Sequence, residues 1–266
     1  MYGAIIGDIV GSPYEFGKRK KNKLFRLFCR KSHFTDDTAM TVAIADALLR
    51  YGENADEQEM KKAFQDSMQL WGNRYINAGY GGLFYEWLLS SDPKPYGSYG
   101  NGSAMRVSPV GFYYSTLERT REVARWSAEV MHNDPEGIKG AEATASSIWL
   151  ARHGAIKADI KEYIENEFGY DLTETCDEIR PKYCFICTCQ GSVPESIRAF
   201  LDGRNYVDCV RTAISLGGDA DTMGCITGGI AEAYYGMPKW LVNKGKRRLP
   251  KDMVEVMERL YSRRGA

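Results

Sequence analysis

Two short acidic segments have the composition of a divalent-cation site. Residues 35–38 read Thr-Asp-Asp-Thr and residues 219–222 read Asp-Ala-Asp-Thr, and each opens an apolar run rich in small residues that is typical of a buried helix. One such segment alone is an ordinary helix start, because Asp and Thr cap the free amides of a first turn. Four carboxylates brought together would repel one another, so the pair predicts hard cations between them.

The spacing within each segment lets the side chains converge. Asp36 and Asp37 are adjacent where a helix begins, and Asp219 and Asp221 are separated by one residue, which in extended backbone directs both to the same side. Oxygen-only ligands suit Mg²⁺, Mn²⁺ or Ca²⁺ rather than zinc or copper, and threonine oxygens can join the carboxylates. The candidate ligands are Thr35, Asp36, Asp37, Asp219, Asp221 and Thr222.

Glycines recur at every fourth position near the N-terminus. Gly3, Gly7 and Gly11 would form a flat stripe on one face of a helix, although a glycine inside a helix costs about 1 kcal/mol relative to alanine. Close packing against another helix is the structural explanation. Its functional extension is that this helix delivers Glu15, in the following loop, to the site; the alternative is a solvated surface glutamate.

Two glycine-rich loops, residues 77–82 and 96–103, could cradle a phosphate with their backbone amides. In the second loop, Asn101 and the serines add donors, and the Tyr99 ring could stack on a base. Neither loop matches the Walker A or the dinucleotide-binding pattern, so tight turns remain the alternative.

His132 follows the expected helix 117–131. A cationic side chain is favoured at a helix C-terminus, which supports a structural role. The functional alternative is a hydrogen-bond donor to a bound ligand.

Helical periodicity dominates the elements that must position these residues. Apolar or small residues recur at three- and four-residue spacing, and the best strand candidate is the segment 182–188. We therefore expect an all-α fold of ten or more helices. The expected helices are residues 2–10, 37–51, 56–73, 83–90, 117–131, 135–153, 157–168, 194–201, 206–215, 221–235 and 252–262.

Length and charge exclude several classes of protein. The chain has 266 residues, 44% of them hydrophobic, and we expect residues 1–266 to form a single domain with a large core. Thirty-five basic residues balance thirty-five acidic ones, so no global field draws the protein to nucleic acid or to an anionic membrane. The apolar start, residues 3–10, contains Asp8 and is too short for a membrane span.

The seven cysteines favour a reducing compartment, because an odd number in a chain of this size argues against a disulfide framework. We therefore expect a cytoplasmic protein. Cys184, Cys187 and Cys189 contain a Cys-x-x-Cys pair, but no second pair completes a tetrahedral zinc site. We interpret these three residues as buried small side chains.

Taken together, the motifs resemble those of the ADP-ribosylglycohydrolase family. They are Gly-Asp-x-x-Gly at 7–11 with a following glutamate, Thr-Asp-Asp-Thr at 35–38, Gly-Asn-Gly-Ser-Ala-Met-Arg at 100–106 and Gly-Gly-Asp-Ala-Asp-Thr-Met at 217–223. They stand in the family's order and cover nearly the whole chain.

The resemblance implies a compact all-α fold with two divalent cations, Mg²⁺ or Mn²⁺, at the base of a cleft. It also implies hydrolysis of the bond between ADP-ribose and an acceptor, so the partners would be ADP-ribose and an ADP-ribosylated protein or other acceptor. The six candidate ligands match the family's metal ligands, and Glu15 matches its acidic residue near the scissile bond. Positions matching its substrate-binding loops are Gly79, Tyr80, Gly81, Gly82, Ser98, Tyr99, Asn101, Gly102, Ser103 and His132.

The implied chemistry agrees with the residues. A metal pair can bind the diol of the distal ribose and activate a water, while carboxylates stabilise the positive charge that develops in glycosidic cleavage. We expect Asp37 to be both ligand and proton carrier, and Glu15 to shape the acceptor side.

The acceptor remains open. The glycine loops are similar to those of the branch that removes O-linked ADP-ribose from serine, and arginine-specific relatives need an acceptor-side carboxylate, for which Asp92 is the nearest candidate. We favour an O-linked acceptor, with N-linked arginine second. A metal-dependent nucleotide phosphoesterase and a non-catalytic ADP-ribose-binding or crystallin-like protein are the alternatives from other classes.

Overall fold

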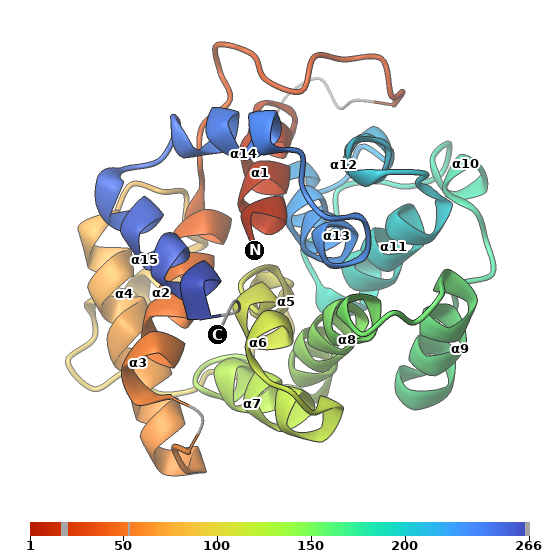
Figure 1. Cartoon of the computed structure of the whole chain (residues 1–266). Helices are drawn as coiled ribbons and strands as arrows, with labels where there is room; N and C mark the ends of the chain where they lie inside the picture. The colour runs from red at the N-terminus through yellow and green to blue at the C-terminus, as the bar shows by residue number, and fades with distance from the viewer. Residues whose placement is uncertain (17–20, 53, 264–266) are drawn as a thin grey trace.

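The computed structural model describes residues 1–16, 21–52 and 54–263. Within these ranges the chain forms helices joined by loops, with one 3₁₀ turn, η1 (Ser12–Tyr14), and no β-strand, so the predicted all-α fold is confirmed (Figure 1). The α-helices are α1 (Tyr2–Gly11), α2 (Asp36–Tyr51), α3 (Glu57–Arg74), α4 (Gly82–Leu89), α5 (Gly102–Met105), α6 (Ser108–Tyr113), α7 (Leu117–Glu129), α8 (Pro135–Arg152), α9 (Lys157–Phe168), α10 (Cys176–Ile179), α11 (Cys189–Asp202), α12 (Tyr206–Ser215), α13 (Ala220–Tyr235), α14 (Lys239–Lys246) and α15 (Lys251–Ser262).

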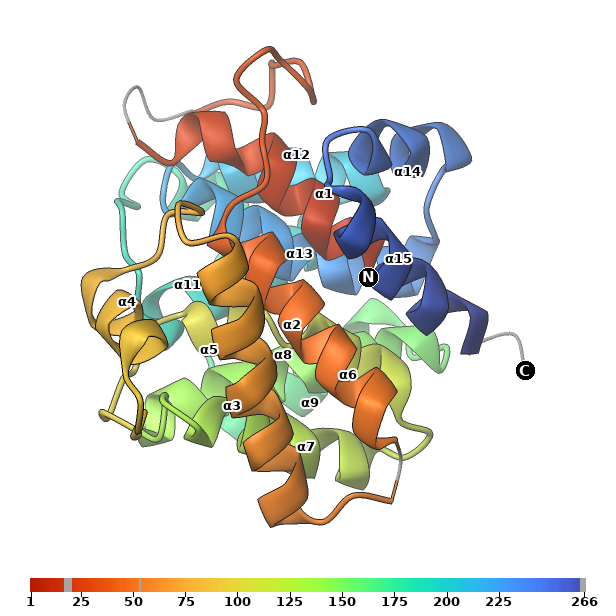
Figure 2. The same cartoon turned by 90° about the vertical axis from the view of Figure 1, so that its left-hand side faces the viewer.

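The packing of α1 against α13 places the two halves of the sequence together. An added Cβ at Gly3, Gly7 or Gly11 would overlap the backbone of Gly228, Gly224 or Ala220, respectively. The two helices are therefore antiparallel and touch backbone to backbone, which confirms the structural explanation of the glycine stripe. Figure 2 shows α1 lying across α13. Consequently the C-terminal end of α1 meets the N-terminal end of α13, where the second acidic segment lies.

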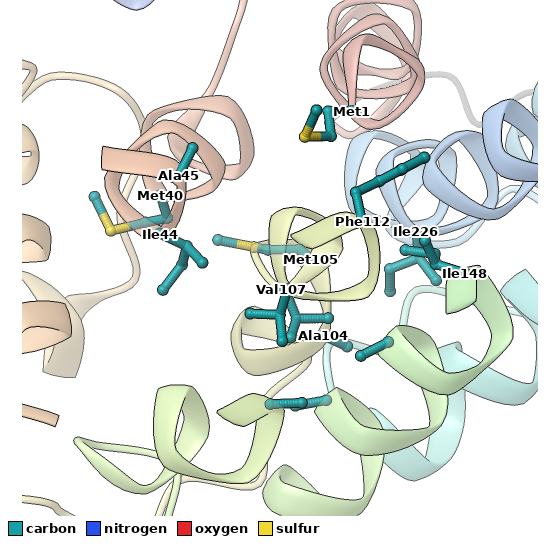
Figure 3. Close-up of a cluster of buried hydrophobic side chains, with 14 of the residues drawn as sticks. Met1, Met40, Ile44, Ala45, Ala104, Met105, Val107, Phe112, Ile148 and Ile226 are labelled. Carbon is teal, nitrogen blue, oxygen red and sulfur yellow. The ribbon is translucent and has the colours of Figure 1, made fainter. Parts of the chain in front are cut away.

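The core lies among α2, α5, α6, α8 and α13. Met40 and Ile44 of α2, Met105 at the end of α5 and Phe112 of α6 belong to one buried cluster, which Ile226 of α13 also joins (Figure 3). Buried apolar surface of this extent is the main stabilising contribution to the fold. It also fixes the short helices α5 and α6 behind the cleft described below.

The best strand candidate of the sequence, residues 182–188, is not a strand in the structure. This segment is a loop whose one ladder contact is an isolated bridge between Thr188 and Gly100. The bridge is supported by two backbone hydrogen bonds, from the Asn101 amide to the Cys187 carbonyl and from the Cys189 amide to the Tyr99 carbonyl, both 2.9 Å. The loop is therefore joined to residues 99–101 at one end only, which is too little to form a sheet.

Several other helices differ from the predicted ones. Helix α11 begins at Cys189 rather than at Pro194, so Pro194 lies inside the helix. Pro194 has no N–H to donate to the carbonyl of Gln190, but Gln190 is exposed, so the missing hydrogen bond is tolerated. Helix α6 carries Pro109 at its second position, where the missing N–H is tolerated. Helices α5, α10 and α14 were also not predicted, and the first two span only four residues each.

None of the helices in the described ranges combines the length and the apolar character needed to cross a bilayer.

The glycine stripe can be tested with Gly7→Ala. The new methyl group would meet the backbone of Gly224, which cannot rotate away, so we expect the free energy of unfolding to fall by about 2–3 kcal/mol. The matched control is Gly72→Ala in α3, where the new methyl would meet only the end of the Leu88 side chain. Urea unfolding measures both variants. Equal losses in the two would contradict the backbone-contact explanation.

Candidate metal centre and cleft

Three elements bring five carboxylates to one place. The turn after α1 carries one of them, the first turn of α2 carries two, and the N-terminus of α13 carries two. Their side chains all line one cavity of about 440 Å³. The five are Glu15, Asp36, Asp37, Asp219 and Asp221.

Direct contacts join the two acidic segments. Carboxylate oxygens of Glu15, Asp219 and Asp221 lie within 4.8 Å of one another, a spacing that could hold a metal ion. The Thr222 hydroxyl donates to Oδ2 of Asp37 across 3.2 Å, and so connects α13 to α2. The segments separated by nearly two hundred residues in the sequence therefore share one site.

Asp8, inside α1, fixes the start of α2. Its buried carboxylate accepts hydrogen bonds from the Thr35 amide at 3.0 Å, the Thr35 hydroxyl at 2.8 Å, the Thr38 amide at 3.2 Å and the Thr38 hydroxyl. These donors are the free groups of a helix N-terminus, where negative charge is favoured. Asp8 thereby orients Asp36 and Asp37 towards α13.

The first acidic segment also contacts the first glycine loop. The Asp36 amide donates to the Ala78 carbonyl at 2.9 Å, and the next residue, Gly79, has a φ of +106°, a conformation that L side chains rarely adopt. An added Cβ at Gly81 or Gly82 would meet no atom within 4 Å, so their backbone borders open space.

The electrostatics of the site favour a bound cation. Burial, followed by repulsion from neighbouring carboxylates, raises the pKa of Asp36, Asp37 and Asp221 well above the ordinary range. Burial also raises the pKa of Glu15 to about 7. Oδ1 of Asp37 is buried without a hydrogen-bond partner among the described residues. Concentrated negative charge with an unsatisfied oxygen is the donor set that a hard divalent cation requires, so these residues fit such an ion.

Most of the sequence-predicted residues line this cavity. Besides the five carboxylates, they are Gly79, Gly81, Gly82, Ser98, Asn101, Gly102, His132 and Thr222. Asn101 also donates from Nδ2 to Oδ2 of Asp219 across 2.9 Å, which links the second glycine loop to the acidic site. The loop itself is held by the bridge from Gly100 to Thr188.

Four predicted residues lie next to the cavity without lining it. Thr35 is buried, and its hydroxyl proton is donated to Asp8. The Tyr80 ring packs on Phe84, with its hydroxyl buried. Ser103 is fully buried and donates to the Gly137 carbonyl at 2.6 Å. Tyr99 is half exposed on the surface.

The cavity wall includes residues that the sequence analysis did not select. They are Phe16, Leu83, Phe84, Tyr96, Met105, Arg106, Phe185 and Cys187. Phe16 and Phe185 come from distant segments and lie with their ring centroids 6.4 Å apart. Asp8 was also not predicted as a site residue. Its signal in the sequence was a charged side chain inside an otherwise apolar helix that was expected to be buried.

The interpretation of the three neighbouring cysteines as buried is wrong for two of them. Cys189 is buried, but Cys184 and Cys187 are exposed, because residues 182–188 form a surface loop rather than a strand within the core.

Comparisons with known proteins agree with one another. A family model described as ADP-ribosylglycohydrolase matches residues 1–266. The chain is 27% identical to ADP-ribosylhydrolase ARH3 of Mus musculus, over 89% of this chain and 83% of that protein. It is 24% identical to ADP-ribosylarginine hydrolase Tri1 of Pseudomonas putida, over 91% of this chain and 72% of that protein. A solved structure titled "ADP-ribosylglycohydrolase-related protein complex" has a TM-score of 0.68 at 23% identity, covering 98% of this chain and 96% of that chain, and so has the same fold.

Asp8→Asn tests the positioning of the first acidic segment. Asparagine keeps one acceptor oxygen, but its NH₂ group would face the donors of Thr35 and Thr38, so the start of α2 should shift. We therefore expect the dissociation constant for Mn²⁺ to rise about tenfold. Asp46→Asn is the control, because Asp46 is also buried but accepts from Arg50 of α2 and Trp71 of α3 and does not line the cavity. Titration calorimetry measures both. An unchanged affinity in Asp8→Asn would contradict the assignment.

The buried carboxylates predict a pH dependence of stability in the metal-free protein. A carboxyl whose pKa is raised in the folded state stabilises the fold while it is protonated. For Glu15 this contribution is complete below its ordinary pKa of 4.5 and is lost as the pH rises through about 7. Asp36, Asp37 and Asp221, whose pKa values are also raised, likewise make the fold more stable at low pH than at high pH.

In chelator, we therefore expect a melting temperature that is a few degrees higher at about pH 5 than at about pH 8. Mg²⁺ or Mn²⁺ should stabilise most at the higher pH, since a cation requires ionised ligands. Differential scanning calorimetry measures both effects. A melting temperature that rises with pH in chelator would contradict the raised pKa values.

Proposed function

Because the chain belongs to the ADP-ribosylglycohydrolase family, we propose that it is a metal-dependent hydrolase that cleaves the glycosidic bond between ADP-ribose and an O-linked acceptor. The observation that supports this most directly is the cluster of five carboxylates, contributed by three elements, at one cavity. Such a concentration of buried negative charge destabilises a fold that does not use it. The proposed reaction also requires a binding site for ADP-ribose, a proton donor and a surface for the acceptor.

The cations would be held by oxygens of both acidic segments. Asp36, Asp37, Asp219 and Asp221 offer carboxylates, and Thr222 offers a hydroxyl. Thr35 already donates its proton to Asp8, which leaves oxygen lone pairs for a cation. We propose Mg²⁺ or Mn²⁺, which when bound would supply positive charge for the ribose hydroxyls and lower the pKa of a water.

Glu15 would exchange a proton with the leaving acceptor. Its carboxylate is half-buried at the cavity wall and hydrogen-bonded to Asp221, and its pKa of about 7 is that of a group that can donate or accept a proton at neutral pH. Asp37 would keep its unpartnered Oδ1 directed at the reacting centre, both as ligand and as proton carrier. Nearby carboxylates would also stabilise the oxocarbenium-like charge on the ribose.

The glycine loops would hold the rest of ADP-ribose. Gly81 and Gly82 border open space, so oxygens of a ligand can approach their backbone amides closely. Ser98, Asn101 and Gly102 line the same cavity from the other loop. The substrate would then lie between the two loops, with the distal ribose at the acidic end.

The rim of the cavity supports an O-linked rather than an arginine acceptor. A guanidinium would be favoured by a carboxylate on the acceptor side, but among the described residues the cavity has no acidic side chain besides the five of the acidic site. Asp92 does not line it; this exposed side chain pairs with Lys94 at 2.8 Å. Phe16 and Leu83 form apolar parts of the wall.

We also propose a cytoplasmic location, supported by the cysteines, all seven of which are free thiols.

A peptide assay tests the proposed function. Serine-linked and arginine-linked ADP-ribosyl peptides are incubated with the protein in Mg²⁺, in Mn²⁺ and in chelator. We expect metal-dependent release of free ADP-ribose, faster from the serine-linked peptide. Release of AMP would indicate a phosphoesterase, binding without release a non-catalytic protein, and faster release from the arginine-linked peptide would overturn the acceptor preference.

Two substitutions assign the carboxylates in the same assay. Glu15→Gln keeps the shape and removes the proton exchange, so we expect kcat to fall about a hundredfold. Asp221→Asn should weaken metal binding as well. Full turnover by Glu15→Gln would exclude its role as proton carrier.

A further inference from the structure

Arg106 is a buried cation without a carboxylate partner. It lies just after α5, its side chain is almost completely buried, and no acidic side chain of the described residues lies within ion-pair distance of it. Burying a charge in this way is unfavourable unless each donor finds an acceptor. Its Nε has no hydrogen-bond partner among the described residues, so the acceptors of the two terminal nitrogens show what Arg106 does.

Both terminal nitrogens of Arg106 point at one ring atom. Nη1 donates to the Gly102 carbonyl at 3.0 Å, and Nη2 donates to the Ser127 carbonyl at 2.9 Å. Each nitrogen carries a second proton and lies 3.4 Å from Nδ1 of His132, and Nη1 also lies 3.7 Å from the Met131 sulfur. The guanidinium thus presents two further donors to the same nitrogen.

This geometry determines the protonation of the His132 ring. A guanidinium can only donate, so the nitrogen that faces it must carry a lone pair. A proton on Nδ1 would point at two N–H groups and place a second positive charge beside the first.

We propose that Arg106 is a positioning residue that holds His132 as a neutral ring with its proton on Nε2, directed into the cavity as a hydrogen-bond donor. Arg106 acts through His132 and needs no contact of its own with the ligand.

The remaining surroundings agree with a neutral ring. The Tyr96 ring lies 6.3 Å from the His132 ring, and among the described residues no carboxylate forms a hydrogen bond or an ion pair with the imidazole. Burial and the adjacent Arg106 hold the pKa of His132 well below its usual range. The other group of ionisable type near Arg106 is the Cys189 thiol, whose pKa burial raises to about 12, so it is neutral as well.

The Nε2 atom faces the second glycine loop. An added Cβ at Gly102 would lie 3.1 Å from Nε2, and one at Gly100 would lie 3.7 Å away. Nε2 has no hydrogen-bond partner within the described ranges, and His132 lines the cavity. The N–H is therefore available to an acceptor oxygen of a ligand. Given the proposed function, on which this step rests, the oxygen belongs to ADP-ribose.

The two other histidines provide an internal comparison. Nδ1 of His33 lies 2.7 Å from the Lys31 carbonyl, and Nδ1 of His153 lies 2.8 Å from the Trp149 carbonyl. A carbonyl can only accept, so these rings carry a proton on Nδ1, the opposite of His132. With only three histidines in the chain, the pattern of His132 can be distinguished from that of the other two in one spectrum.

The test is a long-range ¹H–¹⁵N correlation spectrum of histidine-labelled protein at neutral pH, without ligand. His132→Ala identifies the signals. We expect a protonated Nε2 and an unprotonated Nδ1 for His132 in the wild type. A proton on Nδ1, or on both nitrogens, would overturn the proposal, and this measurement requires no variant of Arg106 to fold.

Arg106→Lys tests whether Arg106 is the cause. A single ammonium cannot serve both carbonyls and Nδ1, so we expect the His132 signals to shift towards a mixture of tautomers and ADP-ribose to bind about tenfold more weakly. His132→Ala and the double variant should bind ADP-ribose equally weakly, because Arg106 acts only through the ring. Arg259→Lys, an exposed residue of α15, is the control.

The outcomes separate this inference from the proposed function. Unchanged His132 signals in a folded Arg106→Lys variant, or a further loss of affinity in the double variant, would overturn the positioning role. If the wild type shows the expected tautomer but does not bind ADP-ribose, the proposed function fails while the position of the proton stands.

Discussion

The direct backbone contact between α1 and α13 is the constraint on which the site depends. Where the carbonyl of one helix meets the Cα of the other, no side chain can adjust the distance, so the register of the two helices is fixed at Gly3, Gly7 and Gly11. That register brings the turn carrying Glu15 to the start of α13. Asp8, on the same helix, then ties down the start of α2 through four donors. One helix thereby positions the carboxylates of three elements.

The site also shows how differently buried charges can be accommodated. Burial raises the pKa of Asp8 to about 6, and hydrogen bonds from the amides and hydroxyls of a helix start limit that rise. At Asp36, Asp37 and Asp221, burial and then repulsion from neighbouring carboxylates raise the pKa well above the ordinary range. Arg106 represents a third solution, in which carbonyls and one imidazole receive the donors of a cation. The acidic cluster therefore makes the metal-free fold less stable, although the same carboxylates fit a divalent cation.

The sequence predicted those features whose signal is local. Helical periodicity located the long helices, and the spacing of the glycines predicted close packing. The acidic segments were recognisable because each is a helix start with more carboxylates than capping needs. Contacts between distant segments could not be read in this way. The approach of Phe185 to Phe16, the donors around Asp8 and the two carbonyls that receive Arg106 all depend on how loops return to the core. Residues 182–188 have the composition of a strand but find a partner only at Thr188.

The acidic site is positioned by two helices in backbone contact, whereas Phe16, Leu83 and Phe185 at the cavity wall lie outside that contact. This difference has an evolutionary consequence. A substitution on the glycine stripe must be accommodated by two helices at once, so that part of the molecule can change only slowly. Phe16 and Leu83 are exposed, and the loop that carries Phe185 is held at its two ends, by Thr188 and by Tyr183. These positions can vary without moving the carboxylates. Proteins that evolve from this fold can therefore change the residues at the cavity wall while they keep the geometry of the acidic site.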